Sequence, residues 1–196
     1  MLTTIVILII IGVPVTWAIC QNGLVAAREK VSEGWSGITV QLKRRHALVP
    51  NLVQAAQTAM NHENEIFDKL LEARTTAAAA LTSGAQDEVN QAEAALTAAL
   101  SRFAGYAEDT PEITANDNIQ LLQKQLEETE DQIAASRRLY NGNVAAYNTR
   151  LDQIPWSFVA ARGDFSKAKL FEVSQAEMAT ISQDVALSDL GFGAKS

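Results

Sequence analysis

The longest regular pattern in the chain lies in residues 119–151, IQLLQKQLEETEDQIAASRRLYNGNVAAYNTRL. Ten positions in this stretch follow one another at steps of 3 or 4 residues, which is the spacing of one face of an α-helix. They are Ile119, Leu122, Leu126, Thr129, Ile133, Ser136, Tyr140, Val144, Tyr147 and Leu151. The pattern predicts a helix of about 38 residues, about 57 Å long, that ends before Pro155.

A second pattern of this kind lies between residues 24 and 56, where apolar residues recur at steps of 3, 4 or 7. Its members are Leu24, Val31, Trp35, Ile38, Leu42, Val49, Leu52 and Ala56. Pro50 lacks a backbone N–H, so this helix must kink or stop close to Val49. The pattern keeps its phase across the proline, which favours a kink.

The rest of the chain also favours helices. Hydrophobic residues make up 47% of the sequence but aromatic residues only 6%, and no segment alternates with the period of a β-strand. Helical spacing continues over residues 51–83 and 86–103, and residues 106–114, YAEDTPEIT, form the main predicted loop. The sequence therefore predicts an all-α fold.

Residues 1–27 contain no Lys, Arg, Asp or Glu. The run LTTIVILIIIGVPVTWAIC at residues 2–20 is long enough, as a helix, to cross the hydrocarbon core of about 30 Å. A cleaved signal peptide would need a basic start and a small-residue cleavage site, and an acylated Cys20 would need a small residue in place of Ile19. Residues 1–22 are therefore predicted to be a transmembrane anchor.

The charges that follow the anchor predict its orientation. Residues 28–50 carry five basic and two acidic side chains, net +3, whereas residues 51–155 carry seven and sixteen, net −9. Because basic flanks stay in the cytoplasm, we expect a single-pass protein of the bacterial inner membrane with its N-terminus outside and its soluble domain in the cytoplasm. The total charge of −7 argues against a nucleic-acid partner.

One block of sequence resembles a known family. Residues 31–53, VSEGWSGITVQLKRRHALVPNLV, are similar to the signature of bacterial LemA proteins, in which a Trp precedes a QLKRR-x-x-L-[IV]-P-N-L-V run. The second half agrees in order, from His62-Glu63 through Thr129-Glu130 and Tyr140-Asn141 to Ile154-Pro155 and Phe171-Glu172. The resemblance covers about residues 22–172.

The resemblance implies an N-terminal membrane anchor followed by an up-and-down antiparallel four-helix bundle of long coiled-coil-like helices. The bundle is expected at residues 23–155, an aromatic and basic membrane-proximal segment at 156–172 and a C-terminal tail at 173–196. The family has no agreed biochemical activity. Members occur beside membrane proteases of the HtpX type in some genomes, and relatives act at the magnetosome membrane of magnetic bacteria.

A charged residue occupies one step of the second pattern, because Arg45 stands between Leu42 and Val49 where an apolar residue is expected. A buried arginine needs a carboxylate partner, and the acids available in the family pattern are Glu63, Glu130 or both. Such a polar group more often fixes register than adds stability. The predicted structural network consists of Arg45, Glu63, Asn116, Glu130, Arg137, Asn141 and Asn148.

The sequence offers little for catalysis or metal binding. His62-Glu63 is half of a zincin motif, but the second histidine would have to stand at Ile66, and Cys20 is the single cysteine. No Ser/His/Asp or Cys/His arrangement is present to suggest covalent catalysis. We therefore expect no catalytic residue, no metal and no cofactor, and a protein that is not an enzyme.

Two basic segments are candidates for contact with lipid or a partner protein. One is the run at residues 43–46, KRRH, whose alternative is a solvated helix face. The other is residues 156–171, WSFVAARGDFSKAKLF, whose aromatic side chains suit either the headgroup layer or the open end of the bundle. The candidate contact residues are Lys43, Arg44, Trp156, Arg162, Phe165, Lys167 and Lys169.

These features predict a non-enzymatic membrane scaffold or adaptor that self-associates and presents a helical surface to partners. The tail carries scattered apolar residues from Ile181 to Phe192, which a second protomer would cover, or which would fold back on the same bundle. The alternative roles are an accessory subunit of an HtpX-like membrane protease and an envelope-stress or membrane-organising factor.

Overall fold

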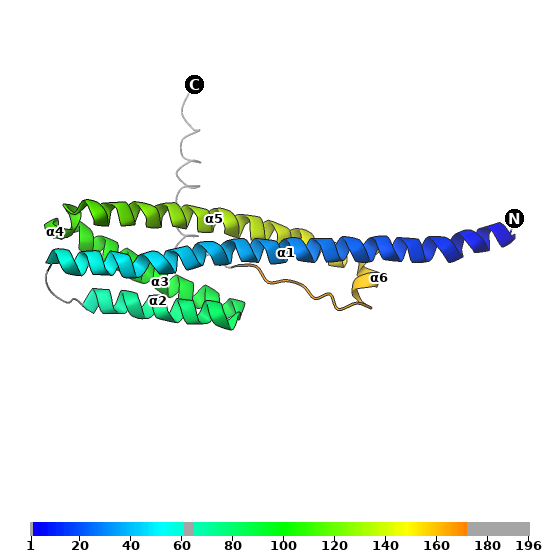
Figure 1. Cartoon of the computed structure of the whole chain (residues 1–196). Helices are drawn as coiled ribbons and strands as arrows, with labels where there is room; N and C mark the ends of the chain where they lie inside the picture. Colours follow the sequence, from blue (N-terminus) through cyan, green and yellow to red (C-terminus); the bar gives the residue numbers. More distant parts are fainter. Residues whose placement is uncertain (1, 61–64, 172–196) are drawn as a thin grey trace, which may run out of the picture.

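The structure, a computed structural model, describes residues 2–60 and 65–171 (Figure 1). Within these ranges it contains helices and no strand, which confirms the predicted all-α class. The helices are α1 (Leu2–Met60), α2 (Glu65–Ser83), α3 (Gln86–Glu108), α4 (Pro111–Thr114), α5 (Asp117–Asp152) and α6 (Trp156–Ala160). The predicted tail at residues 173–196 lies outside the described residues.

The helices α1 and α5 lie side by side and run in opposite directions (Figure 1). The buried residues of α5 are those of the predicted helical face, with Ser136 alone only half-buried. The predicted face of α1 is buried as well, except that Trp35 is half-buried. A Cβ atom on Gly34 would lie 3.1 Å from the Cα atom of Tyr140, so this glycine permits the close approach of the two helices.

The shorter helices α2 and α3 form a hairpin that turns at Gly84, whose φ of 74° favours glycine. The hairpin covers only the part of α1 and α5 that lies far from the N-terminus (Figure 1). The rings of Phe67 on α2 and Phe103 on α3 pack 5.9 Å apart in its core. The prediction of long helices therefore holds for α1 and α5, whereas α2 and α3 have 19 and 23 residues.

Of the two alternatives at Pro50, the helix does not stop there, because α1 continues through the proline to Met60. One predicted boundary was wrong. The predicted loop at residues 106–114 is largely helical, because α3 reaches Glu108 and Pro111 starts the single turn of α4. A proline is well tolerated in the first turn of a helix, where its missing N–H has no helical partner.

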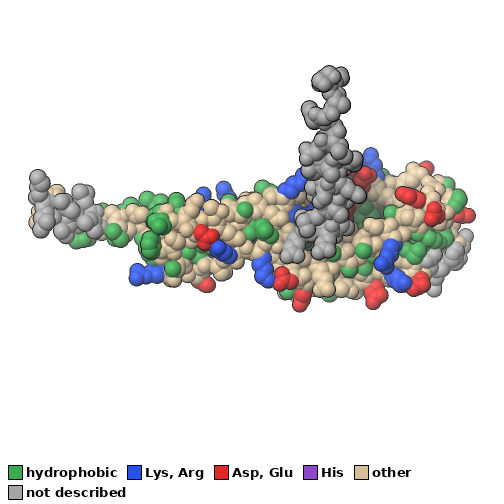
Figure 2. Space-filling view, turned by 180° about the vertical axis from the view of Figure 1, so that it is seen from behind, with side chains coloured by type: hydrophobic (Ala, Val, Ile, Leu, Met, Phe, Trp, Pro, Cys, Tyr) green, Lys and Arg blue, Asp and Glu red, His purple; other side chains and the backbone are tan. Residues whose placement is uncertain are grey.

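The N-terminal part of α1 projects from the rest of the molecule. Its side chains are largely exposed, among them Ile10, Ile11, Val13, Val15 and Ile19. In the described chain, α1 is the one helix that is long and apolar enough to cross a membrane by length and composition. Figure 2 shows hydrophobic and uncharged surface on this projection, with charged side chains beginning where it joins the other helices.

Candidate functional site

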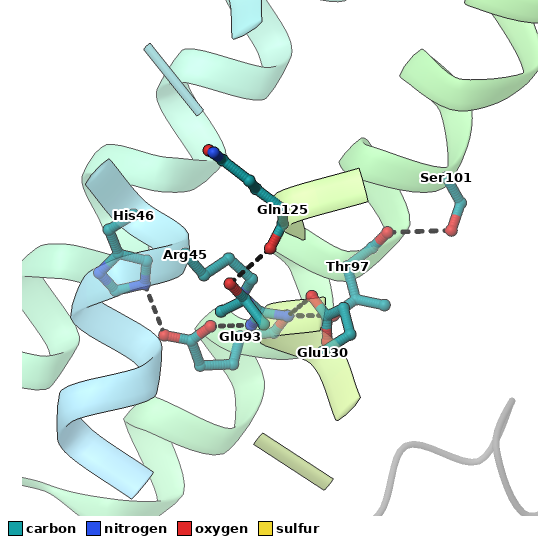
Figure 3. Close-up of polar contacts among 8 residues, drawn as sticks. Arg45, His46, Glu93, Thr97, Ser101, Gln125 and Glu130 are labelled. Atoms are coloured by element: carbon teal, nitrogen blue, oxygen red, sulfur yellow. Dashed lines mark hydrogen bonds and ion pairs between the residues drawn. The ribbon is translucent and has the colours of Figure 1, made fainter. Parts of the chain in front are cut away.

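The buried polar centre of the molecule is built around Arg45, which is 2% exposed. Its guanidinium contacts one carboxylate from each of two other helices, Glu93 on α3 and Glu130 on α5 (Figure 3). The Nη1 atom donates to Glu130 Oε1 at 2.6 Å and to Thr97 Oγ1 at 3.2 Å. Arg45 therefore ties α1, α3 and α5 together.

Two neighbouring residues of α1 donate hydrogen bonds to the carboxylate of Glu93. Its Oε2 accepts from Arg45 Nη2, and its Oε1 accepts from His46 Nε2 at 2.7 Å. Burial would raise the pKa of Glu93, but the hydrogen bond from His46 and the charge of Arg45 lower it below the ordinary value. Glu93 is therefore held as a carboxylate in the interior of the protein.

The same balance keeps Arg45 charged. Burial alone would lower the pKa of its guanidinium, but the charges of Glu130 and Glu93 and their hydrogen bonds raise it. Two carboxylates surround one guanidinium, and the Glu130 side chain remains 42% exposed and can be solvated. Because every charge has a partner within the cluster, the arrangement is suited to fixing helix register.

Sequence reasoning identified Arg45 and Glu130 but missed Glu93 and His46. A signal for Glu93 was present, since it lies four residues after Val89 and three before Leu96 on the apolar face of α3. His46 was assigned to an exposed basic run, but its side chain is buried against Glu93. Glu63, the other predicted partner, lies outside the described residues.

Asn116 and Arg137 are two further members of the predicted network. Asn116 is the N-cap of α5, where its Oδ1 accepts from the backbone N–H groups of Asn118 at 3.0 Å and Ile119 at 3.3 Å. It therefore starts a helix and does not extend the Arg45 cluster. Arg137 lines a small cavity of about 50 Å³ beside that cluster, together with Asn90.

Asn141 and Asn148 bind a different part of the chain, the segment that follows α6 and returns along α5. The side chain of Asn141 donates to the carbonyl of Phe171 at 3.0 Å and accepts from its N–H at 2.8 Å. Asn148 makes the same pair of bonds with Ala168, both at 2.9 Å. We call residues 164–171 the strap. The two asparagines lie seven residues apart on one face of α5, and they hold the strap at two points.

The far end of the strap is attached to α5 and α3. The hydroxyl of Tyr140 donates to the carbonyl of Lys169 at 2.8 Å, and burial raises the pKa of this phenol. Lys169 Nζ also lies 2.6 Å from Asp87 Oδ2, in an exposed ion pair. The ring of Phe171 packs 5.9 Å from that of Trp35. The strap thus closes the face of the α1 and α5 pair that the hairpin leaves open.

The candidate lipid or partner contacts in residues 156–171 lie in two places, within the strap and near the projecting part of α1. Lys167 and Lys169 are paired with Asp152 and Asp87, so they attach the strap to the molecule. Phe165 lies under the guanidinium of Arg28, at 5.3 Å from the ring centroid. Trp156 is half-buried beside Gly23, whereas Arg162 is exposed at the end that carries the projecting helix.

Lys43 and Arg44 are exposed on α1, in the middle of the molecule. They lie 23 and 24 residues beyond Cys20, which corresponds to about 35 Å along a helix. That distance exceeds the reach of surface electrostatics at physiological salt, about 8 Å. The position of these two side chains therefore does not favour contact with lipid, which leaves a partner protein or a solvated helix face as alternatives.

Over the described ranges, no group of three or more His, Cys, Asp or Glu side chains is arranged to hold a metal ion. The cluster at Arg45 contains a histidine and two carboxylates, but their polar atoms are directed at the guanidinium and at one another (Figure 3). Its chemistry is that of a closed ion-pair network. The residues described around it include no nucleophile hydrogen-bonded to a base.

The sequence is similar to three magnetosome proteins and matches one family model. Two magnetosome proteins of Paramagnetospirillum magneticum, MamQ 1 and MamQ 2, are each 25% identical to this chain, over 87% of it and 71% of their own length. Magnetosome protein MamQ of Magnetospirillum gryphiswaldense is 23% identical over 76% of this chain and 64% of its own length. The family model described as the LemA family matches residues 34–184. The chain belongs to the LemA family.

Proposed function

We propose that this protein is a non-enzymatic scaffold, anchored in the bacterial inner membrane by one helix, that holds an up-and-down four-helix bundle in the cytoplasm. The observation that carries the proposal is the continuity of α1, which runs as one helix from the apolar N-terminal stretch into the core of the domain. Its 59 residues correspond to about 88 Å. A helix without a linker fixes both the distance and the direction of the bundle relative to the membrane.

The anchor itself is supported by the exposed apolar surface of α1 and by the absence of charge before Arg28. The orientation rests on the net charge of +3 in residues 28–50. A cysteine in place of Gly84, in a Cys20→Ala background, tests it in intact spheroplasts. We expect no reaction with a membrane-impermeant maleimide until the membrane is permeabilised. Reaction from outside would reverse the topology.

The surface that best suits self-association is a groove of about 410 Å³ between α3 and α5. Leu52, Leu100, Phe103 and Leu126 supply its apolar lining, and polar side chains such as Gln123 and Glu127 lie around them. An apolar groove with a polar rim has the composition of a protein interface. The proposed occupant is a second copy of the chain.

Two exposed alanines of α3 provide a matched test of this groove. Ala104 lines it, whereas Ala98 is exposed but does not. In native membranes we expect crosslinking and native mass spectrometry to detect an oligomer that Ala104→Arg abolishes and Ala98→Arg preserves. A wild-type chain that is solely monomeric at native expression would contradict self-association. An interaction with a membrane protease lost only in Ala104→Arg would assign the groove to an accessory-subunit role.

A further inference from the structure

The corner between α5 and α6 carries an uncharged run. Residues 153–161, QIPWSFVAA, lie between Asp152 and Arg162 and contain no charged side chain. Ile154 and Phe158 within this run are 74% and 65% exposed. Two large apolar side chains that protrude from a neutral corner mark a surface suited to an apolar environment.

Contacts with α1 show how far this corner reaches. Before it, Arg150 Nη1 donates to the carbonyl of Gly23 at 3.1 Å. At its tip, Phe158 and Val159 face α1 residues between Gly12 and Cys20 across an apolar pocket of about 250 Å³. The chain therefore advances toward the N-terminus of α1 by 3 to 11 residues, about 4 to 16 Å, relative to Gly23.

After the corner the chain turns back. Arg28 Nη1 donates to the carbonyl of Asp164 at 3.5 Å, and the Arg28 guanidinium lies over the ring of Phe165. The segment that follows Phe158 has thus returned to the level of the first charged residue of α1. From Arg150 to Phe165 the chain therefore runs along the side of α1 toward the N-terminus of that helix and then back. It reaches farthest at Phe158 and Val159, beside the apolar stretch of α1.

The α1 residues beside that point lie within the hydrocarbon core however α1 is centred in the bilayer. About 20 helical residues cross the hydrocarbon core, and every window of 20 residues within the charge-free residues 1–27 includes residues 8–20. The α1 side of the pocket, from Gly12 to Cys20, falls inside this shared part. The tip of the corner is therefore at hydrocarbon depth whenever α1 spans the membrane.

Several backbone N–H groups of the corner are satisfied internally, which suits them to that depth. The N–H of Ser157 donates to the carbonyl of Gln153 at 2.8 Å, and the N–H of Ala161 donates to the carbonyl of Ser157 at 3.0 Å. The N–H of Gly163 donates to the carbonyl of Val159 at 2.9 Å. Irregular backbone without such bonds is excluded from lipid. Arg150 and Arg162 flank the corner, where their charges can reach the headgroups.

We propose that residues 154–159 form a re-entrant corner that inserts Ile154 and Phe158 beside α1 into the leaflet that faces the helical domain. Acyl chains of membrane phospholipids occupy the pocket between α6 and α1. The proposal rests on the proposed membrane anchor, and it adds a second point at which the bundle is held on the bilayer. With two inserted points, tilting of the domain relative to the membrane plane is then restricted.

Nitroxide labels on the full chain in phospholipid vesicles test this depth. In a Cys20→Ala background, Phe158→Cys and Ile154→Cys report the corner, Val13→Cys the span, and Leu139→Cys an exposed apolar position on α5 away from the corner. Molecular oxygen concentrates in the bilayer, whereas a water-soluble nickel complex stays outside. We expect the two corner labels to collide with oxygen and not with nickel, as at Val13, and the label at Leu139 to show the reverse.

Each alternative result overturns the proposal in a distinguishable way. Corner labels reached by nickel while Val13 is shielded would place the corner in water and leave the anchor intact. Corner labels shielded from both reagents would indicate a protein contact in place of lipid. A label at Val13 that nickel reaches would overturn the anchor itself, and with it the depth of the corner.

Discussion

Arg74 on α2 donates from its Nε to the backbone carbonyl oxygen of His46 on α1, at 3.0 Å. In an uninterrupted helix this oxygen would accept from the N–H of the residue four positions on. That residue is Pro50, which has no N–H. The side chain of Arg74 thus satisfies the acceptor that the proline leaves, and it explains how α1 continues to Met60.

Removal of this donor should matter only while the proline is present. We expect Arg74→Met to lower the free energy of unfolding by about 1.5 to 3 kcal/mol, the usual contribution of a hydrogen bond from a charged group. In a Pro50→Ala background the N–H of residue 50 replaces Arg74, so the same substitution should cost much less. Denaturant unfolding of the full chain in detergent, followed by circular dichroism, measures both. Equal costs in the two backgrounds would refute the compensation.

The helical faces of α1 and α5 could be predicted because burial in this fold follows the 3.6-residue period over long distances. Leu42 and Val49 mark the face on either side of Arg45, and both are fully buried. Between them, Arg45 is a charged residue at a step of this otherwise apolar pattern. Its contact with Glu130 could be proposed, together with or in place of a contact with Glu63, since the family pattern limits the available acids.

The strap could not be predicted, since it has no periodicity and its stability comes from contacts distant in sequence. Asn141 was expected to extend the network of Arg45, but it binds the backbone of Phe171, 30 residues later. An asparagine amide pairs equally well with a side chain or with a backbone, and spacing does not distinguish the two. The hairpin position that brings Glu93 to Arg45 likewise depends on tertiary packing.

The two ion pairs of Arg45 should differ in strength. Breaking the buried pair by Arg45→Met leaves Glu93 without its cation and should cost about 3 to 5 kcal/mol. Double-mutant cycles with Glu93→Gln and Glu130→Gln should give the larger coupling for Glu93, because the Glu130 side chain is 42% exposed and water screens its charge. A coupling to Glu130 as large as that to Glu93 would contradict this order.

Acid should destabilise the fold through Glu93. Its folded-state pKa is lowered, so its contribution is fully present above the ordinary value of 4.5 and is lost as the pH falls through the lower folded value. We expect unfolding midpoints to decrease below about pH 4.5 in the wild type and to change less with pH in Glu93→Gln. Glu65→Gln is the control, since the pKa of that exposed carboxyl is lowered by Lys69 on the surface. A pH profile unchanged in Glu93→Gln would show that other carboxyls dominate.

Loss of one asparagine should release the strap. In Asn148→Ala the backbone of Ala168 loses both of its bonds to the side chain, so trypsin should cleave after Lys167 and Lys169 several times faster than in the wild type. Asn143→Ala serves as the control, because this side chain binds the carbonyl of Lys30 and not the strap. Limited proteolysis with mass spectrometry measures the rates. Equal acceleration in both variants would mean that cleavage reports global unfolding.

Two glycines one helical turn apart on α1 provide a direct test of the close packing between α1 and α5. A Cβ atom on Gly34 would lie 3.1 Å from the Tyr140 Cα, a backbone atom that can move only if α5 moves. Gly37 has nothing within 4 Å of the corresponding position.

Alanine favours a helix over glycine by up to about 1 kcal/mol, so Gly37→Ala should stabilise the protein by a similar amount. Gly34→Ala gains the same propensity but must separate the helices, and we expect a net loss of about 1 to 3 kcal/mol. Thermal unfolding of the two full-length variants in the same detergent measures the difference, and a Gly34→Ala protein as stable as Gly37→Ala would show that α1 and α5 do not require this contact.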